Sequence, residues 1–105
     1  MDDQRECEHL VISALCQGTP QGSVKGPARR ILAGYRWLEP HHQLVYEVLL
    51  AIPFDSPDVV HQQLPARLTR AGFPDFDVES FFRPHRLSRQ SAEELMSELA
   101  RMPAL

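Results

Sequence analysis

The five histidines and two cysteines are the residues of this sequence best suited to binding a metal ion. A metal site needs its ligands on one face, as two histidines four residues apart on a helix provide. Cys7 and His9 are two residues apart and His41 and His42 are adjacent, so neither pair shares a helix face. Only tertiary folding could gather the more distant histidines, which are His41, His61 and His85. We therefore expect solvated or hydrogen-bonded histidines, with no metal and no other cofactor.

Three further features that could support catalysis do not indicate an active site. The glycine-rich segment 18–26 follows a helical pattern instead of a strand, and Lys25 follows a valine, so it does not match a phosphate-binding loop. The sequence has no Gly-x-Ser-x-Gly nucleophile motif. The adjacent carboxylates Glu93 and Glu94 suit the first turn of a helix, where they favour its dipole. The sequence therefore predicts a protein that is not an enzyme and has no catalytic residues.

One basic segment, residues 83–89, could contact a phosphate backbone or an acidic partner. Its arginines are Arg83, Arg86 and Arg89. No aromatic residue that could stack on a base is interleaved with them, and the preceding Phe81 and Phe82 suit a hydrophobic core. We interpret the segment as a solvated basic linker. The alternative is an accessory protein that binds nucleic acid through this segment, with further contacts from Lys25, Arg29 and Arg30.

Length and composition favour one soluble globular domain. The chain has 105 residues, of which 43% are hydrophobic and 24% charged, close to globular averages. Its net charge of −3 argues against a protein whose main activity is binding phosphates. The longest strongly apolar stretch, residues 44–52, contains Glu47 and is far shorter than the roughly 20 residues of a membrane span. Because the N-terminal segment is acidic, unlike a targeting peptide, we expect a single cytoplasmic domain over residues 1–105.

Apolar spacing, with proline and glycine as start and stop signals, predicts an all-α fold. We expect one compact domain of five to six short helices, arranged as an orthogonal bundle. Their ranges are about 3–16, 28–38, 40–52, 57–71, 78–82 and 92–102. Asp2 or Asp3 would cap the first helix and Gly18 would end it. Residues 17–27 contain several glycines and prolines, which predicts a flexible loop.

Four details of these helices can also be predicted. Residues 44–52 are apolar almost all round, which is typical of a central helix. Pro65 removes a hydrogen bond, so we expect either two short helices that meet near Leu64 or one sharp kink in the helix 57–71. Ser91 and Glu94 have the spacing of a capping box, and Pro103 would end that helix. Cys7 and Cys16 are nine residues apart in the first helix, too far apart for a disulfide, so we expect reduced, buried thiols.

Two stretches of the sequence suggest a known family. Residues 8–15 read Glu-His-Leu-Val-Ile-Ser-Ala-Leu, an acidic residue followed by an aliphatic run. Residues 37–46 contain an aromatic residue followed by Pro40, His42 and Tyr46 at Pro-x-His-x-x-x-aromatic spacing. Together with the helix start at 56–58, these stretches resemble the N-terminal domain of bacterial replicative DNA helicases of the DnaB type. The resemblance covers about residues 6–72.

The resemblance implies protein–protein contact, since family members are all-helical domains that pack in helicase rings. A related fold ends the bacterial primase, where it docks on the helicase. This chain departs from the family at Pro65 and over residues 73–89. The long helical hairpin through which such domains pair is missing, or reduced to residues 91–102.

We therefore predict a non-enzymatic protein–protein interaction module acting in DNA replication. The expected partner is a helicase or primase component, which would compete with a weak homodimer; neither nucleic acid nor a membrane is expected. Aromatic and apolar side chains left over after core formation would dock in a partner groove. The candidate interface residues are Tyr35, Trp37, Met96 and Met102. Trp37 alternatively packs over the corner between the helices 28–38 and 40–52.

Overall fold

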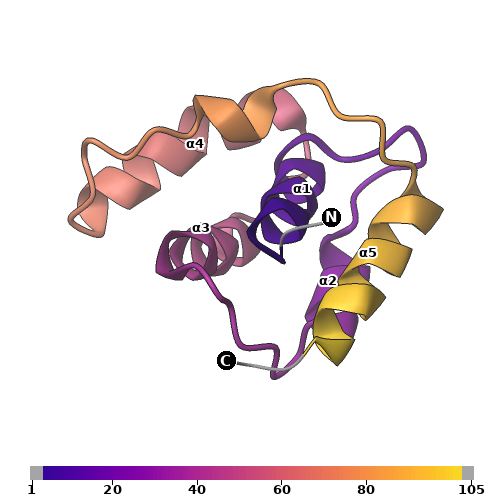
Figure 1. Cartoon of the computed structure of the whole chain (residues 1–105). Helices are drawn as coiled ribbons and strands as arrows, with labels where there is room; N and C mark the ends of the chain where they lie inside the picture. Colours follow the sequence, from indigo (N-terminus) through magenta and orange to yellow (C-terminus); the bar gives the residue numbers. More distant parts are fainter. Residues whose placement is uncertain (1–3, 103–105) are drawn as a thin grey trace.

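Helix α1 (Gln4–Gln17) lies at the centre of the computed structural model, which describes residues 4–102 (Figure 1). It packs against α3, α4, α5 and the 3₁₀ helix η1, and every residue from Val11 to Cys16 is buried. The prediction that residues 44–52 form the central helix is therefore wrong. Small side chains such as Ser13 and Ala14 explain the difference, because they let neighbours approach α1 from several sides.

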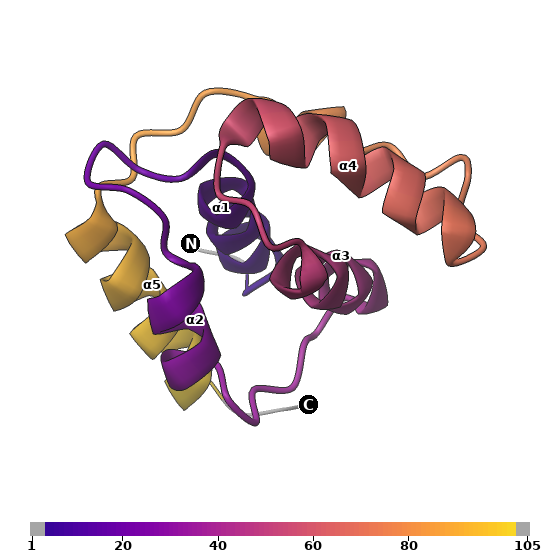
Figure 2. The same ribbon diagram turned by 180° about the vertical axis from the view of Figure 1, so that it is seen from behind.

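The elements after α1 are short helices joined by irregular segments. In chain order they are α2 (Lys25–Ile31), α3 (Pro40–Ala51), α4 (Pro57–Arg70), η1 (Glu79–Phe82) and α5 (Arg89–Arg101). Figure 2 shows α2 and α5 side by side on one flank of α1, with α3 and α4 on the other. Residues 4–102 contain no strand, only an isolated bridge between Thr19 and Gly22. The predicted all-α class is confirmed.

The second helix is shorter and begins earlier than the predicted range 28–38. Val24 is buried just before α2 begins, which anchors the start of the helix and shortens the predicted loop 17–27 at its end. Gly34 adopts φ +79, a left-handed conformation that favours glycine, so the chain does not continue in a helical conformation beyond it. Residues 35–39 then run as an irregular connection to α3. Consequently neither Tyr35 nor Trp37 lies on a helix.

Helix α4 continues through Pro65, so the predicted outcome of two short helices that meet near Leu64 is wrong. Proline at this position removes only the hydrogen bond that the carbonyl of His61 would accept. His61 is exposed, so water can satisfy that carbonyl. Thr69 also donates its hydroxyl to the carbonyl of Pro65 at 2.9 Å. The carbonyl that the proline leaves without its helical hydrogen bond thus lies on the solvent-facing side of the helix.

Helix α5 begins at Arg89, earlier than the predicted start at 92. Its N-cap is Ser88, whose hydroxyl accepts a hydrogen bond from the N–H of Ser91 at 3.1 Å. The predicted capping box of Ser91 and Glu94 is therefore wrong: Glu94 instead accepts from Gln90 one turn before it, at 3.2 Å. The predicted caps Asp2 and Asp3 and the predicted stop at Pro103 lie outside the described residues.

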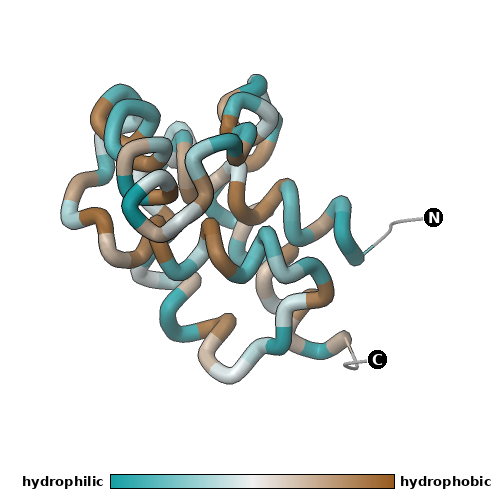
Figure 3. The backbone as a smooth tube through the Cα atoms, turned by 90° about the vertical axis from the view of Figure 1, so that its left-hand side faces the viewer, coloured by the Kyte–Doolittle hydropathy of each residue, from teal (hydrophilic) through white to brown (hydrophobic). Residues whose placement is uncertain are grey.

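The core forms where the apolar faces of the helices meet α1. Apolar and hydrophilic residues alternate in short blocks along the backbone (Figure 3). Of the two phenylalanines predicted for the core, Phe81 is buried and Phe82 is partly buried. Cys7 and Cys16 are both buried on α1. Burial raises the pKa of the Cys16 thiol to about 12, so that thiol stays protonated at neutral pH.

Within residues 4–102, no helix combines the length and apolar character needed to cross a membrane.

Candidate functional site

The carboxylate of Glu8 is completely buried and accepts four hydrogen bonds. Its Oε2 accepts from the hydroxyl of Tyr35 at 2.5 Å and from the N–H of Leu38 at 2.7 Å. Its Oε1 accepts from the N–H of Glu39 at 3.2 Å and lies 2.9 Å from Nδ1 of His42. These bonds compensate the desolvation of the carboxylate, which would otherwise be costly.

Glu8 connects α1 to the irregular segment 35–39 and to the start of α3. Leu38 and Glu39 precede the first residue of α3, where the helix dipole favours a negative charge. From the sequence, Glu8 was identified only as the acidic residue that opens the stretch 8–15. The signal that could have revealed its role is its position three, four and seven residues before buried apolar residues of α1, which are Val11, Ile12 and Leu15. A carboxylate on an apolar face implies a buried partner.

Tyr35 and Trp37 lie together at the edge of this hydrogen-bonded cluster. Their rings meet edge to face with centroids 5.2 Å apart, and Trp37 also packs against Tyr46 at 4.8 Å. Both side chains are half-buried against the core, so Trp37 does pack over the corner between α2 and α3. Burial raises the pKa of both Tyr35 and Tyr46, which keeps their hydroxyls protonated as hydrogen-bond donors.

The accessible sides of these rings line an open groove of about 320 Å³ between the end of α2 and α3. Its other lining residues include Leu32, Gln43 and Leu50. We call this surface the Tyr35–Trp37 groove. It combines aromatic rings with polar groups at its edge, as protein-docking surfaces do.

The last helix does not provide the second apolar surface that the sequence predicted. Met96 is 0% exposed, and Met102 is partly buried against the core. The apolar face of α5, with Ala92 and Leu99, packs on α1 and α2. Met96 therefore cannot contact a partner in this structure, and the prediction that it lies at an interface is wrong.

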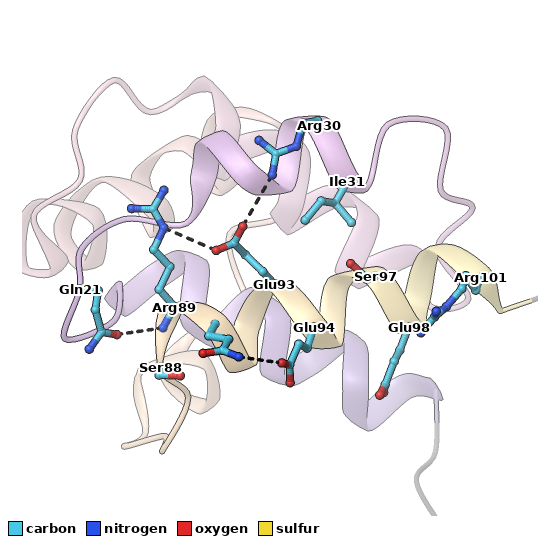
Figure 4. Close-up of a pocket in the computed structure, with 11 residues that line it drawn as sticks. Gln21, Arg30, Ile31, Ser88, Arg89, Glu93, Glu94, Ser97, Glu98 and Arg101 are labelled. Atoms are coloured by element: carbon cyan, nitrogen blue, oxygen red, sulfur yellow. Dashed lines mark hydrogen bonds and ion pairs between the residues drawn. The ribbon is translucent and has the colours of Figure 1, made fainter.

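A larger groove, of about 1020 Å³, lies between α2 and α5 and is lined mainly by charged and polar side chains (Figure 4). Glu93 lies between Arg30 and Arg89, with nitrogen–oxygen distances of 3.6 Å to each. The N–H of Arg89 donates to the side chain of Gln21 at 3.0 Å. Glu93 therefore offsets part of the positive charge that Arg30 and Arg89 bring to this groove.

The basic segment 83–89 remains at the surface. Arg83, Arg86 and Arg89 are all exposed, but Arg89 belongs to α5 and pairs with Glu93. The carbonyl of Arg83 accepts a hydrogen bond from the side chain of Gln17 at 2.7 Å, which fixes the backbone and leaves the guanidinium outside. This arrangement fits the solvated linker that we predicted.

Lys25, Arg29 and Arg30, which could have extended that segment, make other contacts. Lys25 is 5% exposed, and its ammonium donates to the carbonyls of Ile52 at 2.9 Å and Phe54 at 2.7 Å, where α3 ends. Arg29 donates to the carbonyl of Leu50 at 2.8 Å. The sequence placed Lys25 in a flexible loop and thus missed this buried contact. Lys25 and Arg29 therefore do not extend the basic segment, whereas Arg30 lines the same groove as Arg89 and shares Glu93 with it.

The histidines are hydrogen-bonded or paired individually. His41, His61 and His85 contact Glu39 at 3.5 Å, Glu79 at 2.7 Å and the carbonyl of Gly18 at 3.0 Å, respectively. The described part of the chain contains no group of three histidine, cysteine or acidic side chains placed to hold a metal. His41, His61 and His85, which only tertiary folding could have gathered, are therefore not brought together as a metal site.

The fold and the site define a small all-α domain with a half-exposed aromatic groove held by a buried carboxylate. Comparison with known proteins gives no match: no family model, no curated protein and no solved structure matches this chain. The residues of the chain itself are thus the basis for any functional proposal.

Proposed function

We propose that this chain is a non-enzymatic interaction module that docks a protein partner on the Tyr35–Trp37 groove. The observation that carries the proposal is the half-exposed pair of aromatic rings, fixed by the bond from Tyr35 to Glu8 and by the contact of Trp37 with Tyr46. Aromatic anchors contribute strongly to protein interfaces. Anchors that are already ordered also lose little conformational entropy on binding.

The partner that we propose is a component of a bacterial replicative helicase or primase. The two stretches that resemble the helicase domain, residues 8–15 and 37–46, meet in space through the contact between Glu8 and His42. This contact supports the proposal because it makes the resembling stretches one structural unit. The same resemblance implies action in DNA replication. We also propose the cytoplasmic location expected from the sequence.

A weak homodimer would use the same groove. With Met96 buried, the Tyr35–Trp37 groove is the apolar surface that remains from the predicted interface. Isologous dimers form where such a surface meets its own copy. We expect a monomer–dimer mixture at micromolar concentration, and the helicase or primase component should displace the second copy.

The test is the variant Trp37→Ala, examined by ultracentrifugation and by binding to a purified replicative helicase and a purified primase. We expect it to lose both self-association and partner binding. Phe54→Ala is the matched control, because Phe54 is an exposed aromatic residue outside the groove. Circular dichroism would show that both variants remain folded. If Trp37→Ala dimerises and binds like the unaltered chain, Trp37 is only a core residue and the proposal is wrong.

A nucleic-acid-binding accessory protein is the second candidate function. The observation in its favour is that Arg83 and Arg86 are exposed, and both lie in the segment that joins η1 to α5. It has less support than protein docking, because Lys25 and Arg29 contact backbone carbonyls instead of extending this basic surface. A salt titration, described in the Discussion, distinguishes the two functions.

A further inference from the structure

A second groove, of about 500 Å³, lies where the segment after α4 meets the start of α3. The segment 72–77 forms most of its wall, and His41 closes it from α3. In Figure 1 this segment follows the free end of α4 at the left edge of the molecule, beside α3. None of its lining residues belongs to the Tyr35–Trp37 groove, so the two surfaces can be tested independently.

Backbone hydrogen bonds order the wall of this groove. Gly72 ends α4 at φ +98, a conformation that favours glycine, and the N–H of Phe73 donates to the carbonyl of Leu68 at 2.8 Å. At the other end, the carboxylate of Asp77 accepts from the N–H of Glu79 at 3.0 Å. The groove thus needs little rearrangement to receive a ligand.

Two phenylalanines give the groove its aromatic surface. Phe73 is 43% exposed, an unusual position for a large apolar side chain. Phe76 is partly buried, and its ring meets the ring of His41 edge to face at 5.5 Å. One ring is therefore accessible to a ligand while the other is fixed against the protein.

The charge of the groove is acidic. Asp75 and Asp77 line it and are exposed, while none of its lining residues is a lysine or an arginine. His41, the one other ionisable lining residue, lies 3.5 Å from Glu39 on the side of α3. Exposed carboxylates beside an accessible aromatic ring complement a planar cation, which can stack on the ring and donate to the carboxylates together.

We propose that this groove binds an arginine side chain presented by a partner protein. A guanidinium matches it better than an ammonium does, because the guanidinium is planar, weakly hydrated and able to form paired hydrogen bonds with a carboxylate. The chain would then contact a partner at two separate surfaces, one aromatic and one acidic. This inference does not depend on the Tyr35–Trp37 groove.

The test is an NMR titration of the full chain, labelled with ¹⁵N, with the capped peptide Gly-Arg-Gly-Arg-Gly. We expect shift changes concentrated at His41 and residues 72–77, with weaker binding of the matching lysine peptide by about 2- to 5-fold and no binding of the glutamate peptide. Equal shifts with the arginine and glutamate peptides, or shifts elsewhere on the chain, would overturn the proposal.

Matched variants locate the binding on the groove. Phe73→Ala and Asp75→Asn should each weaken binding of the arginine peptide by about 2- to 5-fold, since both side chains are at the surface. Phe54→Ala and Asp58→Asn, which alter exposed residues outside the groove, should not. Trp37→Ala should still bind the arginine peptide. The proposal for the Tyr35–Trp37 groove and the proposal for this groove can therefore fail independently. Unchanged binding of the arginine peptide by both groove variants would contradict the inference.

Self-association gives a further outcome. If sedimentation shows association that both Asp75→Asn and Arg86→Ala abolish, the groove receives the basic segment of a second copy. The proposal of a separate partner would then be wrong. A chain whose mass is unaffected by these two variants, combined with the expected peptide binding, supports it.

Discussion

Nδ1 of His42 lies 2.9 Å from the carboxylate of Glu8, although the two residues are 34 positions apart in the chain. The same carboxylate also accepts from two backbone N–H groups that precede α3. A single side chain of the central helix therefore holds the N-terminal end of α3 and the aromatic segment before it against α1.

The first prediction concerns Glu8→Gln. An amide has one oxygen, and its NH₂ group would face either the N–H of Leu38 or that of Glu39, leaving one of these partly buried donors without its acceptor. We expect the free energy of unfolding to fall by about 2–4 kcal/mol in urea melts. Glu6→Gln, an exposed change on the same helix, should cost less than about 0.5 kcal/mol. Equal losses in the two variants would contradict the role assigned to Glu8.

The helices were predictable where local signals act alone. Pro40 starts α3 and Gly18, at φ +71, follows α1, both as expected from residue type. The errors came from contacts between distant segments. Lys25 was placed in a loop because its carbonyl partners, Ile52 and Phe54, are more than 25 residues away. No local pattern could reveal such partners.

The candidate site was predictable only in part. Tyr35 and Trp37 were identified by residue type, and the structure does place them in one groove, though on an irregular segment instead of a helix. Met96 could not be placed correctly, because a methionine on an amphipathic helix looks the same whether its face is covered or exposed. Which helix covers α5 is decided by tertiary packing.

Leu49→Ala tests the packing of α3 against its neighbours. Leu49 is completely buried, so its truncation should reduce the free energy of unfolding by about 2–5 kcal/mol. Leu10→Ala is the matched control, since Leu10 is 40% exposed on α1 and its truncation should cost less than about 0.5 kcal/mol. A loss below about 0.5 kcal/mol for Leu49→Ala, measured in urea, would mean that α3 is peripheral.

His9 should make stability depend on pH. Burial, and secondarily the charges of His42 and Arg83, lower its pKa below the ordinary value of 6.5. The unfolded chain therefore binds the proton more readily, so the stabilising contribution is complete above pH 6.5 and is lost as the pH falls toward the lower, folded pKa. His9→Phe should keep the stacking on Phe81 and flatten this dependence in urea melts at several pH values. An equally steep loss in His9→Phe would refute the assignment.

Nucleic-acid binding by the basic segment can be tested with random duplex and single-stranded DNA. If Arg83 and Arg86 neutralise phosphates, binding weakens steeply with added salt, and the slope decreases by about one for each arginine removed. For a solvated linker we expect no binding at physiological salt, measured by fluorescence anisotropy. Salt-dependent binding that Arg83→Ala and Arg86→Ala reduce would favour the nucleic-acid function over protein docking.

The burial of Lys25 can be tested directly, because it is the only lysine of the sequence. Its ammonium is enclosed by two carbonyls and lies 3.6 Å from the carboxylate of Asp55. Arg36→Lys adds an exposed amine to the same chain as an internal reference. We expect an amine-acylating reagent to modify position 25 about tenfold or more slowly than position 36, and both equally in urea, as read by peptide mass spectrometry. Burial also lowers the pKa of Lys25, which increases its unprotonated, reactive fraction, so slow acylation can only reflect restricted access. Equal rates at the two positions in the folded chain would show that Lys25 lies in a flexible loop after all.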